Sequence, residues 1–300
     1  HGDGVQTRPL RMRDVVLIPA FNRPELLHHT IAHICNAERA QEMHYIFRFD
    51  AGHNPELHEV VRGFPFSHEV TVTPRSSYGI GKQSFSLLSG YKYAASKATR
   101  HVFMIEEDVF VASDFFAWHH EVHADNPDLF CSIAVENPNR KVPTGAHDEY
   151  YLTTDDYCSL GVCFHRDVLI DHVERHAQPG YYVQPHTYCR RHFPAAPFNP
   201  THTEQDGLLR RIQWNLGMVR PIAYPYAAKA YHAGYYGANR ADPPSGTLEQ
   251  RITHITAVCY NDEAMRTFAL HPAYYEDSKP INLKAETWQR LKRIPMPTAQ

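Results

Sequence analysis

The chain has 300 residues, 43% of them hydrophobic, which is enough to bury the core of one large or two small globular domains. Its 30 Lys and Arg residues against 33 Asp and Glu residues give a net charge of −3, so it lacks the cationic field that grips nucleic acid or an anionic membrane. It contains no run of 18 or more apolar residues and no apolar segment in its first ten residues, so neither a membrane span nor a signal peptide is predicted.

The first half of the sequence alternates strand and helix patterns. Apolar runs predict strands at residues 14–21, 44–49, 69–74 and 101–105, and helical periodicity follows from Pro24, from Pro55 and over residues 82–100. This alternation predicts an α/β fold with a mostly parallel sheet covered by helices on both faces. Such sheets bind ligands beyond the carboxyl ends of their strands, where we expect one crevice to contain Asn22, Asp50, Glu106, Glu107 and Asp108.

The second half is less regular. It predicts strands at residues 128–135, 159–165 and 218–225, helices at 166–174 and from 201 onward, and loops at 137–157, 177–200 and 231–240. The six cysteines form no CxxC pair, which argues against a disulfide scaffold and favours a reducing compartment. HTYCRRH offers two histidines and a cysteine, but a structural zinc site needs a fourth ligand that is not evident nearby.

The acidic triplet Glu106, Glu107 and Asp108 directly follows the strand HVFMI. Adjacent carboxylates repel one another and lose solvation when buried, so a positive charge is expected nearby. A solvated acidic turn is the simpler interpretation. The position at a strand end in the predicted crevice favours instead a Mg²⁺ or Mn²⁺ site, because these ions take carboxylate and phosphate oxygens as ligands.

Several segments, in chain order, resemble one family. IEEDVFVASDFF is similar to the metal motif and following helix of GT-A fold glycosyltransferases, in particular the N-acetylglucosaminyltransferase I family, which adds GlcNAc from UDP-GlcNAc to mannose. VVLIPAFNRPEL and FDAGHNPE resemble its two nucleotide-binding turns, and GKQSFSLLSGYKYA resembles the helix before the metal motif. DLFCSIAVENPN, SLGVCFHRDVL, EQDGLLRR and VRPI resemble segments of its acceptor half. The resemblance covers residues 14–237.

The resemblance implies a GT-A (Rossmann-like) domain over residues 12–237, with a nucleotide-sugar half that ends at about residue 115 and an acceptor half after it. Residues 238–300, which carry helical patterns, would form a C-terminal extension packed on this domain. The implied activity is a metal-dependent, inverting transfer of GlcNAc or another hexose from a UDP-sugar to a hydroxyl group of a glycan or other acceptor.

The resemblance also implies roles for single residues. Asp108 falls at the direct ligand of Mn²⁺ or Mg²⁺, and His232 is a second candidate ligand, although a surface histidine beside tyrosines is the alternative. Asp206 falls at the catalytic base, with Glu204 in reserve, although acids at a helix start also serve as caps. The residues expected at the nucleotide sugar are Arg23, Asp50, Lys82, Glu106 and Glu107, with Arg240, Trp214, Tyr235 and Tyr236 as further candidates.

The sequence departs from the family at several positions. The triplet is Glu-Glu-Asp, which changes the middle acid, and Phe21, Ala51 and Met218 stand where the animal members have cysteines. Cys131 therefore has no matching partner, which favours a cytoplasmic, bacterial or viral setting over a secretory one. The predicted loops at 137–157 and 177–200 do not match the family, so the acceptor is not specified.

Three other functions fit part of the pattern. A sugar-nucleotide nucleotidyltransferase shares the sheet and the acidic metal ligands, although AFNRPEL lacks the glycine-rich phosphate loop expected after its first strand. A nucleotide-sugar or carbohydrate-binding protein without turnover would keep the same acids. A glycosyltransferase that modifies DNA bases would need a basic stripe along the phosphates, which this slightly acidic chain lacks.

Overall fold

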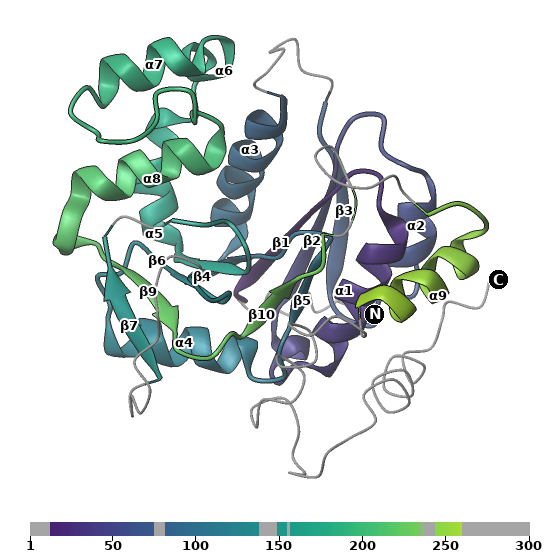
Figure 1. The fold of residues 1–300 in the computed structure, drawn as a ribbon. Coiled ribbons are helices and arrows are strands. Elements are labelled where there is room, and N and C mark those ends of the chain that lie inside the picture. Colours follow the sequence, from purple (N-terminus) through teal and green to yellow (C-terminus); the bar gives the residue numbers. More distant parts are fainter. Residues whose placement is uncertain are drawn as a thin grey trace, which may run out of the picture.

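The computed structural model describes residues 13–74, 82–137, 149–154, 157–234, 236 and 244–259. In this part of the chain an eight-stranded sheet lies between two layers of helices (Figure 1). Its strands are β1 Val15–Ala20, β2 His44–Phe49, β3 His68–Val72, β4 His101–Met104, β6 Cys131–Ile133, β7 Tyr150–Thr153, β8 Val162–His165 and β9 Ile222–Pro225. A second sheet pairs β5 Val109–Val111 with β10 Ala230–His232.

The helices alternate with these strands in the first half and cluster in the second. They are α1 Pro24–Asn36, α2 Glu56–Val61, α3 Lys82–Lys97, α4 Phe115–Asp125, α5 Arg166–Val168 with its continuations η3 Leu169–Val173 and η4 Glu174–His176, α6 Pro179–Val183, α7 Pro185–His192, α8 Gln205–Leu216 and α9 Leu248–Cys259. Short turns of 3-10 helix occur at η1 Ala40–Glu42 and η5 Gly217–Val219.

The strand order is β3-β2-β1-β4-β8-β6-β9-β7. The strands from β3 to β4 are parallel, β8 runs antiparallel between β4 and β6, β9 is parallel to β6, and β7 is antiparallel to β9. The predicted α/β, Rossmann-like fold class with a mostly parallel sheet is therefore confirmed. The carboxyl ends of β1, β2 and β4 meet at one edge of this sheet, as expected for neighbouring parallel strands.

The core follows the two-residue period of the strands. Val15 and Leu17 of β1 face the layer of α3, α5 and α8, whereas Val16 and Ile18 face the layer of α1, α2 and α4. All four side chains are buried. Because both faces of the parallel half are covered, β1 reads as a continuous apolar run, and this is why the sequence locates it well.

Three predicted loops contain regular structure, so these parts of the prediction were wrong. Residues 177–200 form α6 and α7, whose prolines occupy the first helical turn, where a missing N–H costs nothing. Residues 150–153 form β7, and residues 230–232 form β10 beyond what the sequence indicates as the last strand. Residues 138–148 and 237–243 lie outside the described part.

The helix α9, which belongs to the predicted C-terminal extension, packs on α1. Ile255 and Cys259 are buried against Leu26 of α1, and the Arg251 guanidinium bridges Glu25 of α1 and Glu56 of α2. The division of the chain at residue 237 remains a prediction. Within the described residues, no helix has the length and apolar character needed to cross a membrane.

Candidate active site

The strand β1 leads into Arg23 and the strand β4 leads into the acidic triplet, and these two segments meet. Arg23 Nε lies 2.6 Å from Glu107 Oε1, and Arg23 Nη1 lies 2.6 Å from Asp108 Oδ2. Both carboxylates are almost fully buried, at 4% and 2% exposure. The positive charge that the triplet requires is therefore supplied in part by Arg23, which the sequence predicts instead at the nucleotide sugar.

Hydrogen bonds to the backbone hold the triplet in place. The Phe21 N–H donates to Glu107 Oε2 at 2.8 Å, and the Thr30 hydroxyl donates to the Glu107 carbonyl at 2.8 Å. The Ala233 N–H donates to the Asp108 carbonyl at 2.8 Å, which ties β10 to the same turn. These bonds come from three different elements, so the triplet is a fixed part of the fold and the prediction of a solvated acidic turn does not apply.

The side chains of Asp108 and His232 lie together, as a shared metal site would require. His232 Nε2 is 3.2 Å from Asp108 Oδ2, and the antiparallel pairing of β10 with β5 brings His232 beside the triplet. The buried Asp108 Oδ1 has no hydrogen-bond partner among the described residues. A Cβ on Gly234 would lie 2.6 Å from His232 Nε2 and 2.9 Å from Asp108 Oδ2, so this glycine keeps the space in front of both groups open.

These observations fit a divalent cation. A buried carboxylate oxygen with no hydrogen bond is costly unless it has another partner, and a carboxylate with an imidazole nitrogen is a suitable donor pair for Mn²⁺. Burial raises the pKa of Asp108, but the hydrogen bond from His232 and the charge of Arg23 outweigh burial and lower it below its usual value. Asp108 is therefore ionised at neutral pH, as a metal ligand must be.

Asp206 and Glu106 meet at Ser159, a residue that the sequence did not single out. Ser159 Oγ lies 3.2 Å from Glu106 Oε1 and 3.2 Å from Asp206 Oδ2. Because a hydroxyl group donates one proton, both contacts are hydrogen bonds only when one of the two carboxyl groups is protonated. The strand-to-turn segment before β8, with Gly161 at a φ of 64°, sets this serine between α8 and the triplet.

The same neighbourhood shifts the pKa values of both acids upward. Burial, followed by the charges of Asp108 and Asp206, raises the pKa of Glu106 to about 8. Burial, followed by the charge of Glu204, raises the pKa of Asp206 to about 6, although the Ser159 hydrogen bond opposes it. Burial also raises the pKa of Glu107 despite the adjacent Arg23. Asp206 therefore has the proton affinity expected of a base that works near neutral pH.

Glu204 and Asp206 occupy different environments although only Gln205 lies between them in the sequence. Glu204 precedes α8, makes no side-chain capping bond and is exposed, whereas Asp206 points inward and its Oδ1 has no hydrogen-bond partner among the described residues. Gly207 permits this start of α8, because a Cβ there would lie 2.2 Å from the His202 carbonyl oxygen.

Asp50 lies at the carboxyl end of β2, next to β1 in the sheet. Its carboxylate accepts a hydrogen bond from Ser86 of α3, and its N–H donates to the Ala20 carbonyl at 3.1 Å. Arg48 Nε donates to the Ser86 carbonyl at 3.2 Å and so braces the same pair. Burial raises the pKa of Asp50, opposed by the Ser86 hydrogen bond and by the charge of Arg48.

The remaining predicted contacts are less well placed. Lys82 begins α3, but its side chain, Tyr235 and Arg240 lie outside the described part of the chain. Tyr236 is buried in the core around α9, and Trp214 packs against Phe198 at a ring-centroid distance of 6.3 Å. HTYCRRH lies in α7, where Cys189 is buried and the His186 ring hydrogen-bonds Thr203. The group of metal-ligating side chains found among the described residues does not include them.

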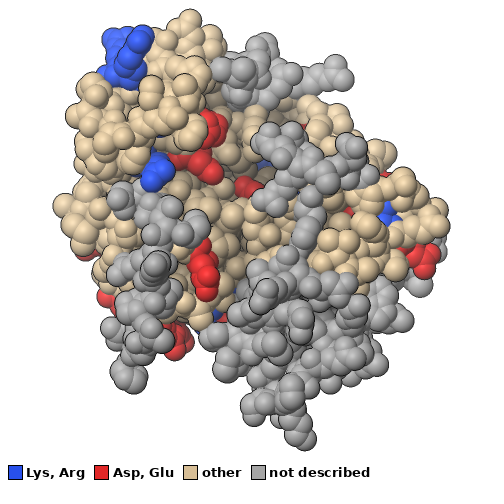
Figure 2. Space-filling model, viewed as in Figure 1, with Lys and Arg blue, Asp and Glu red and all other residues tan. Residues whose placement is uncertain are grey.

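The face of the molecule shown in Figure 2 is hollowed near its middle, and acidic side chains are exposed there with few Lys or Arg side chains beside them. This distribution agrees with the slightly acidic balance of the whole chain.

Comparisons with known proteins give a likeness in fold only. No protein-family model matches the chain, and no curated protein matches it. Two similar solved structures are a galactosyltransferase, LgtC, in complex with donor and acceptor sugar analogues (11% identity, TM-score 0.42, 70% of this chain and 72% of that chain) and mannose-1-phosphate geranyltransferase from Thermus thermophilus (10% identity, TM-score 0.41, 75% and 77%). At such identities and TM-scores, neither activity transfers to this chain.

Proposed function

We propose that the chain is a metal-dependent glycosyltransferase that moves a hexose, GlcNAc being the first candidate, from a UDP-sugar to an acceptor hydroxyl with inversion. The proposal rests on the motif resemblance together with the site at the carboxyl ends of β1, β2 and β4. In this site Asp50 would contact the nucleoside, and Arg23 would exchange a carboxylate for a phosphate oxygen when the donor binds.

Asp108 and His232 would hold the cation, for which the unpaired Asp108 Oδ1 and the space kept by Gly234 provide room. Bound Mn²⁺ or Mg²⁺ supplies charge neutralisation for the departing diphosphate. Glu107 holds Arg23 beside this position, and Glu106 contacts the same Ser159 hydroxyl as Asp206. These two acids are therefore assigned to positioning the charged groups.

Asp206 would remove the proton of the acceptor hydroxyl. Its raised pKa makes it a better proton acceptor than an exposed carboxylate, and the Ser159 hydroxyl fixes the direction of its Oδ2. Glu204 is exposed and stays the reserve candidate.

The observation that carries the proposal is the contrast between two acids that share one neighbour. The pKa of Asp108 is lowered and that of Asp206 is raised, and burial together with the charges of both acids raises the pKa of Glu106. Two carboxylates whose surroundings separate their pKa values are a common arrangement for an electrostatic role and a proton-transfer role.

Slow hydrolysis of a panel of UDP-sugars, with and without Mn²⁺, tests the proposal. We expect Mn²⁺-dependent release of UDP from at least one UDP-hexose. Release of pyrophosphate from UTP and a sugar 1-phosphate would indicate a nucleotidyltransferase instead, and binding of UDP-sugars without any turnover would indicate a binding protein. A preference for GDP-sugars or CMP-sugars would contradict the assignment of the nucleoside pocket.

A further inference from the structure

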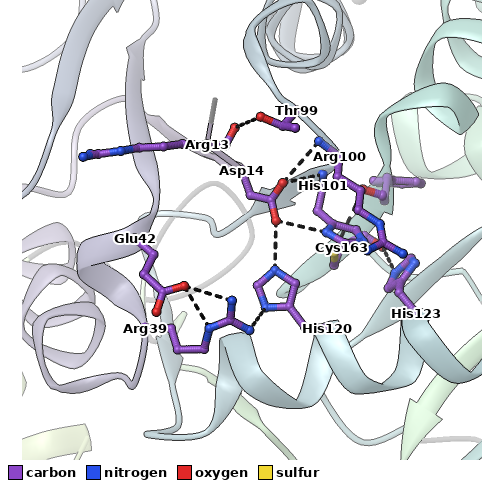
Figure 3. A network of polar contacts seen from close by, with 11 residues as sticks. Arg13, Asp14, Arg39, Glu42, Thr99, Arg100, His101, His120, His123 and Cys163 are labelled. Atoms are coloured by element: carbon purple, nitrogen blue, oxygen red, sulfur yellow. Dashed lines mark hydrogen bonds and ion pairs between the residues drawn. The ribbon is translucent and has the colours of Figure 1, made fainter. Parts of the chain in front are cut away.

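A second cluster of metal-ligating side chains lies at the opposite ends of β1 and β4, away from the acidic triplet (Figure 3). Asp14 directly precedes β1, His101 begins β4, and His120 lies in α4. Their ligand atoms all lie within 4.8 Å of one another. At a rise of about 3.3 Å per residue, the length of β1 separates this cluster from Arg23 by roughly 20 Å or more.

One carboxylate oxygen is the centre of the cluster. The N–H groups of Arg100 and His101 donate to Asp14 Oδ1 at 3.2 and 2.9 Å, which fixes the carboxylate and turns Oδ2 toward the two rings. Asp14 Oδ2 lies 3.0 Å from His101 Nδ1 and 2.9 Å from His120 Nε2. Although burial raises the pKa of Asp14, the hydrogen bonds from both histidines lower it well below its usual value, so this acid is ionised.

We propose that Asp14, His101 and His120 form a binding site for a Zn²⁺-class transition-metal ion, distinct from the cation site at Asp108. Two imidazole nitrogens and one carboxylate oxygen are a donor set that Zn²⁺ accepts readily, whereas Mg²⁺ prefers oxygen ligands alone. The site is independent of the proposed sugar transfer and of the residues assigned to it.

The distances suit such an ion. Two ligand atoms bound tetrahedrally to Zn²⁺ at about 2.0–2.1 Å are about 3.3 Å apart. The contacts of Asp14 Oδ2 therefore need to lengthen by a few tenths of an ångström, and the two ring nitrogens, which lie within 4.8 Å of each other, need to reach the same separation. The His101 side chain is 3% exposed, but those of Asp14 and His120 are 16% and 14% exposed, so an ion can enter from solvent. The neighbouring His123 is not offered as a fourth ligand, because its ring hydrogen-bonds the Cys163 carbonyl. Water would therefore complete the coordination.

Arg39 makes the proposal specific. Arg39 Nη1 lies 2.9 Å from His120 Nδ1, and a guanidinium only donates, so His120 carries its proton on Nε2 and donates it to Asp14. An ion on Nε2 displaces that proton, and neutral imidazole must then carry it on Nδ1, where it opposes Arg39. The Arg39 side chain is 43% exposed and is otherwise held by the exposed Glu42, so it can move aside.

A Zn²⁺ titration in competition with a chromophoric zinc chelator tests this proposal. The chain is first freed of metal with EDTA and desalted. We expect the unmodified chain to bind one equivalent of Zn²⁺ at this site. His120→Gln and Asp14→Asn should bind that equivalent at least about tenfold more weakly. Arg39→Ala should bind that equivalent as tightly as the unmodified chain or more tightly. Co²⁺ bound in place of Zn²⁺ should show the visible absorption bands of a low-symmetry coordination site, and these bands should be absent in His120→Gln.

Two matched histidine variants control the experiment. The ring of His165 lies 5.8 Å from that of His101, but His165 Nδ1 accepts a hydrogen bond from the Asp167 N–H. His165→Gln should therefore leave the bound equivalent of Zn²⁺ intact. His232→Gln tests the cation site at Asp108 and should also leave it intact. Circular dichroism of His120→Gln in EDTA must match the unmodified chain, and His101→Gln provides a second ligand variant if it does not. Full retention of the equivalent in folded ligand variants, or its loss in Arg39→Ala or His232→Gln, would overturn the proposal.

Discussion

Arg23 Nη1 lies 2.6 Å from Asp108 Oδ2, so an arginine in the turn that follows β1 pairs with the last acid of the triplet that follows β4. The same guanidinium contacts Glu107, and both carboxylates are buried while the Arg23 side chain is 20% exposed. A cation on the unpaired Asp108 Oδ1 would therefore join an existing counter-charge. This arrangement explains how the folded chain tolerates three adjacent acids at a buried strand end.

Replacing the proposed base should affect turnover alone. A general base contributes about 10²- to 10⁴-fold to a rate, so we expect Asp206→Asn to lower kcat by that factor and to leave UDP affinity nearly unchanged. Glu204→Gln is the matched control, because Glu204 is exposed two residues away, and its kcat should stay close to that of the unmodified chain. Steady-state kinetics on both variants check this. A collapse in Glu204→Gln with normal transfer by Asp206→Asn would reverse the assignment.

The rate should also depend on pH in a defined direction. Burial raises the pKa of Asp206 to about 6, and a base must be ionised to accept a proton, so kcat should rise as the pH increases through about 6 and then level off. A pH–rate profile at saturating donor and Mn²⁺ measures this rise. The residual activity of Asp206→Asn should lack it. The same rise in that variant would mean that another group titrates.

A methyl group in front of the cation site should weaken metal binding without unfolding the chain. In Gly234→Ala the new Cβ would meet His232 Nε2 and Asp108 Oδ2 at 2.6 and 2.9 Å, so His232 must move away from Asp108. We expect Mn²⁺ affinity to fall at least about tenfold. The matched control is Gly180→Ala, whose Cβ meets only the Tyr188 ring at 3.8 Å. Equal Mn²⁺ affinity in the two variants, measured by calorimetry, would remove His232 from the site.

The C-terminal helix α9 should contribute to the stability of the domain through Arg251, which pairs with Glu25 and Glu56. Arg251→Ala leaves the Glu25 carboxylate, which is 2% exposed, without its partner, and such a loss costs about 3 kcal/mol of unfolding free energy. Lys92→Ala breaks the exposed pair with Glu174 and should cost under about 1 kcal/mol. Urea unfolding compares the two variants. Equal losses would show that α9 adds nothing through Arg251.

The sequence locates the parallel half of the fold well, because β1, β2 and β4 are buried on both faces and appear as continuous apolar runs. It fails where composition and structure disagree. Residues 177–200 contain prolines, tyrosines and histidines typical of loops, yet Pro179 and Pro185 begin helices. The strand β10 is three residues long and has no pattern of its own.

The candidate site was predicted in parts. Asp108, His232 and Asp206 could be named from motifs. Nothing local in the sequence indicates that Ser159 joins Glu106 to Asp206, since Ser159 stands 47 positions before Asp206. The ion pair between Arg23 and the triplet likewise depends on strand order. The contact between Asp14 and His101 could have been predicted from the sequence, because residues that precede or begin neighbouring parallel strands lie together at the amino-terminal edge of the sheet.

Calorimetric titration of UDP, in Mn²⁺ and again in EDTA, tests the proposed function most directly. We expect UDP to bind in Mn²⁺ and to lose most of its affinity in EDTA, because the acids around Asp108 repel a diphosphate when no cation neutralises them. Asp108→Ala should remove the difference between the two titrations, and Glu106→Gln should reduce it less. Equal UDP affinity with and without the cation in the unmodified chain would contradict a metal-dependent nucleotide-sugar site.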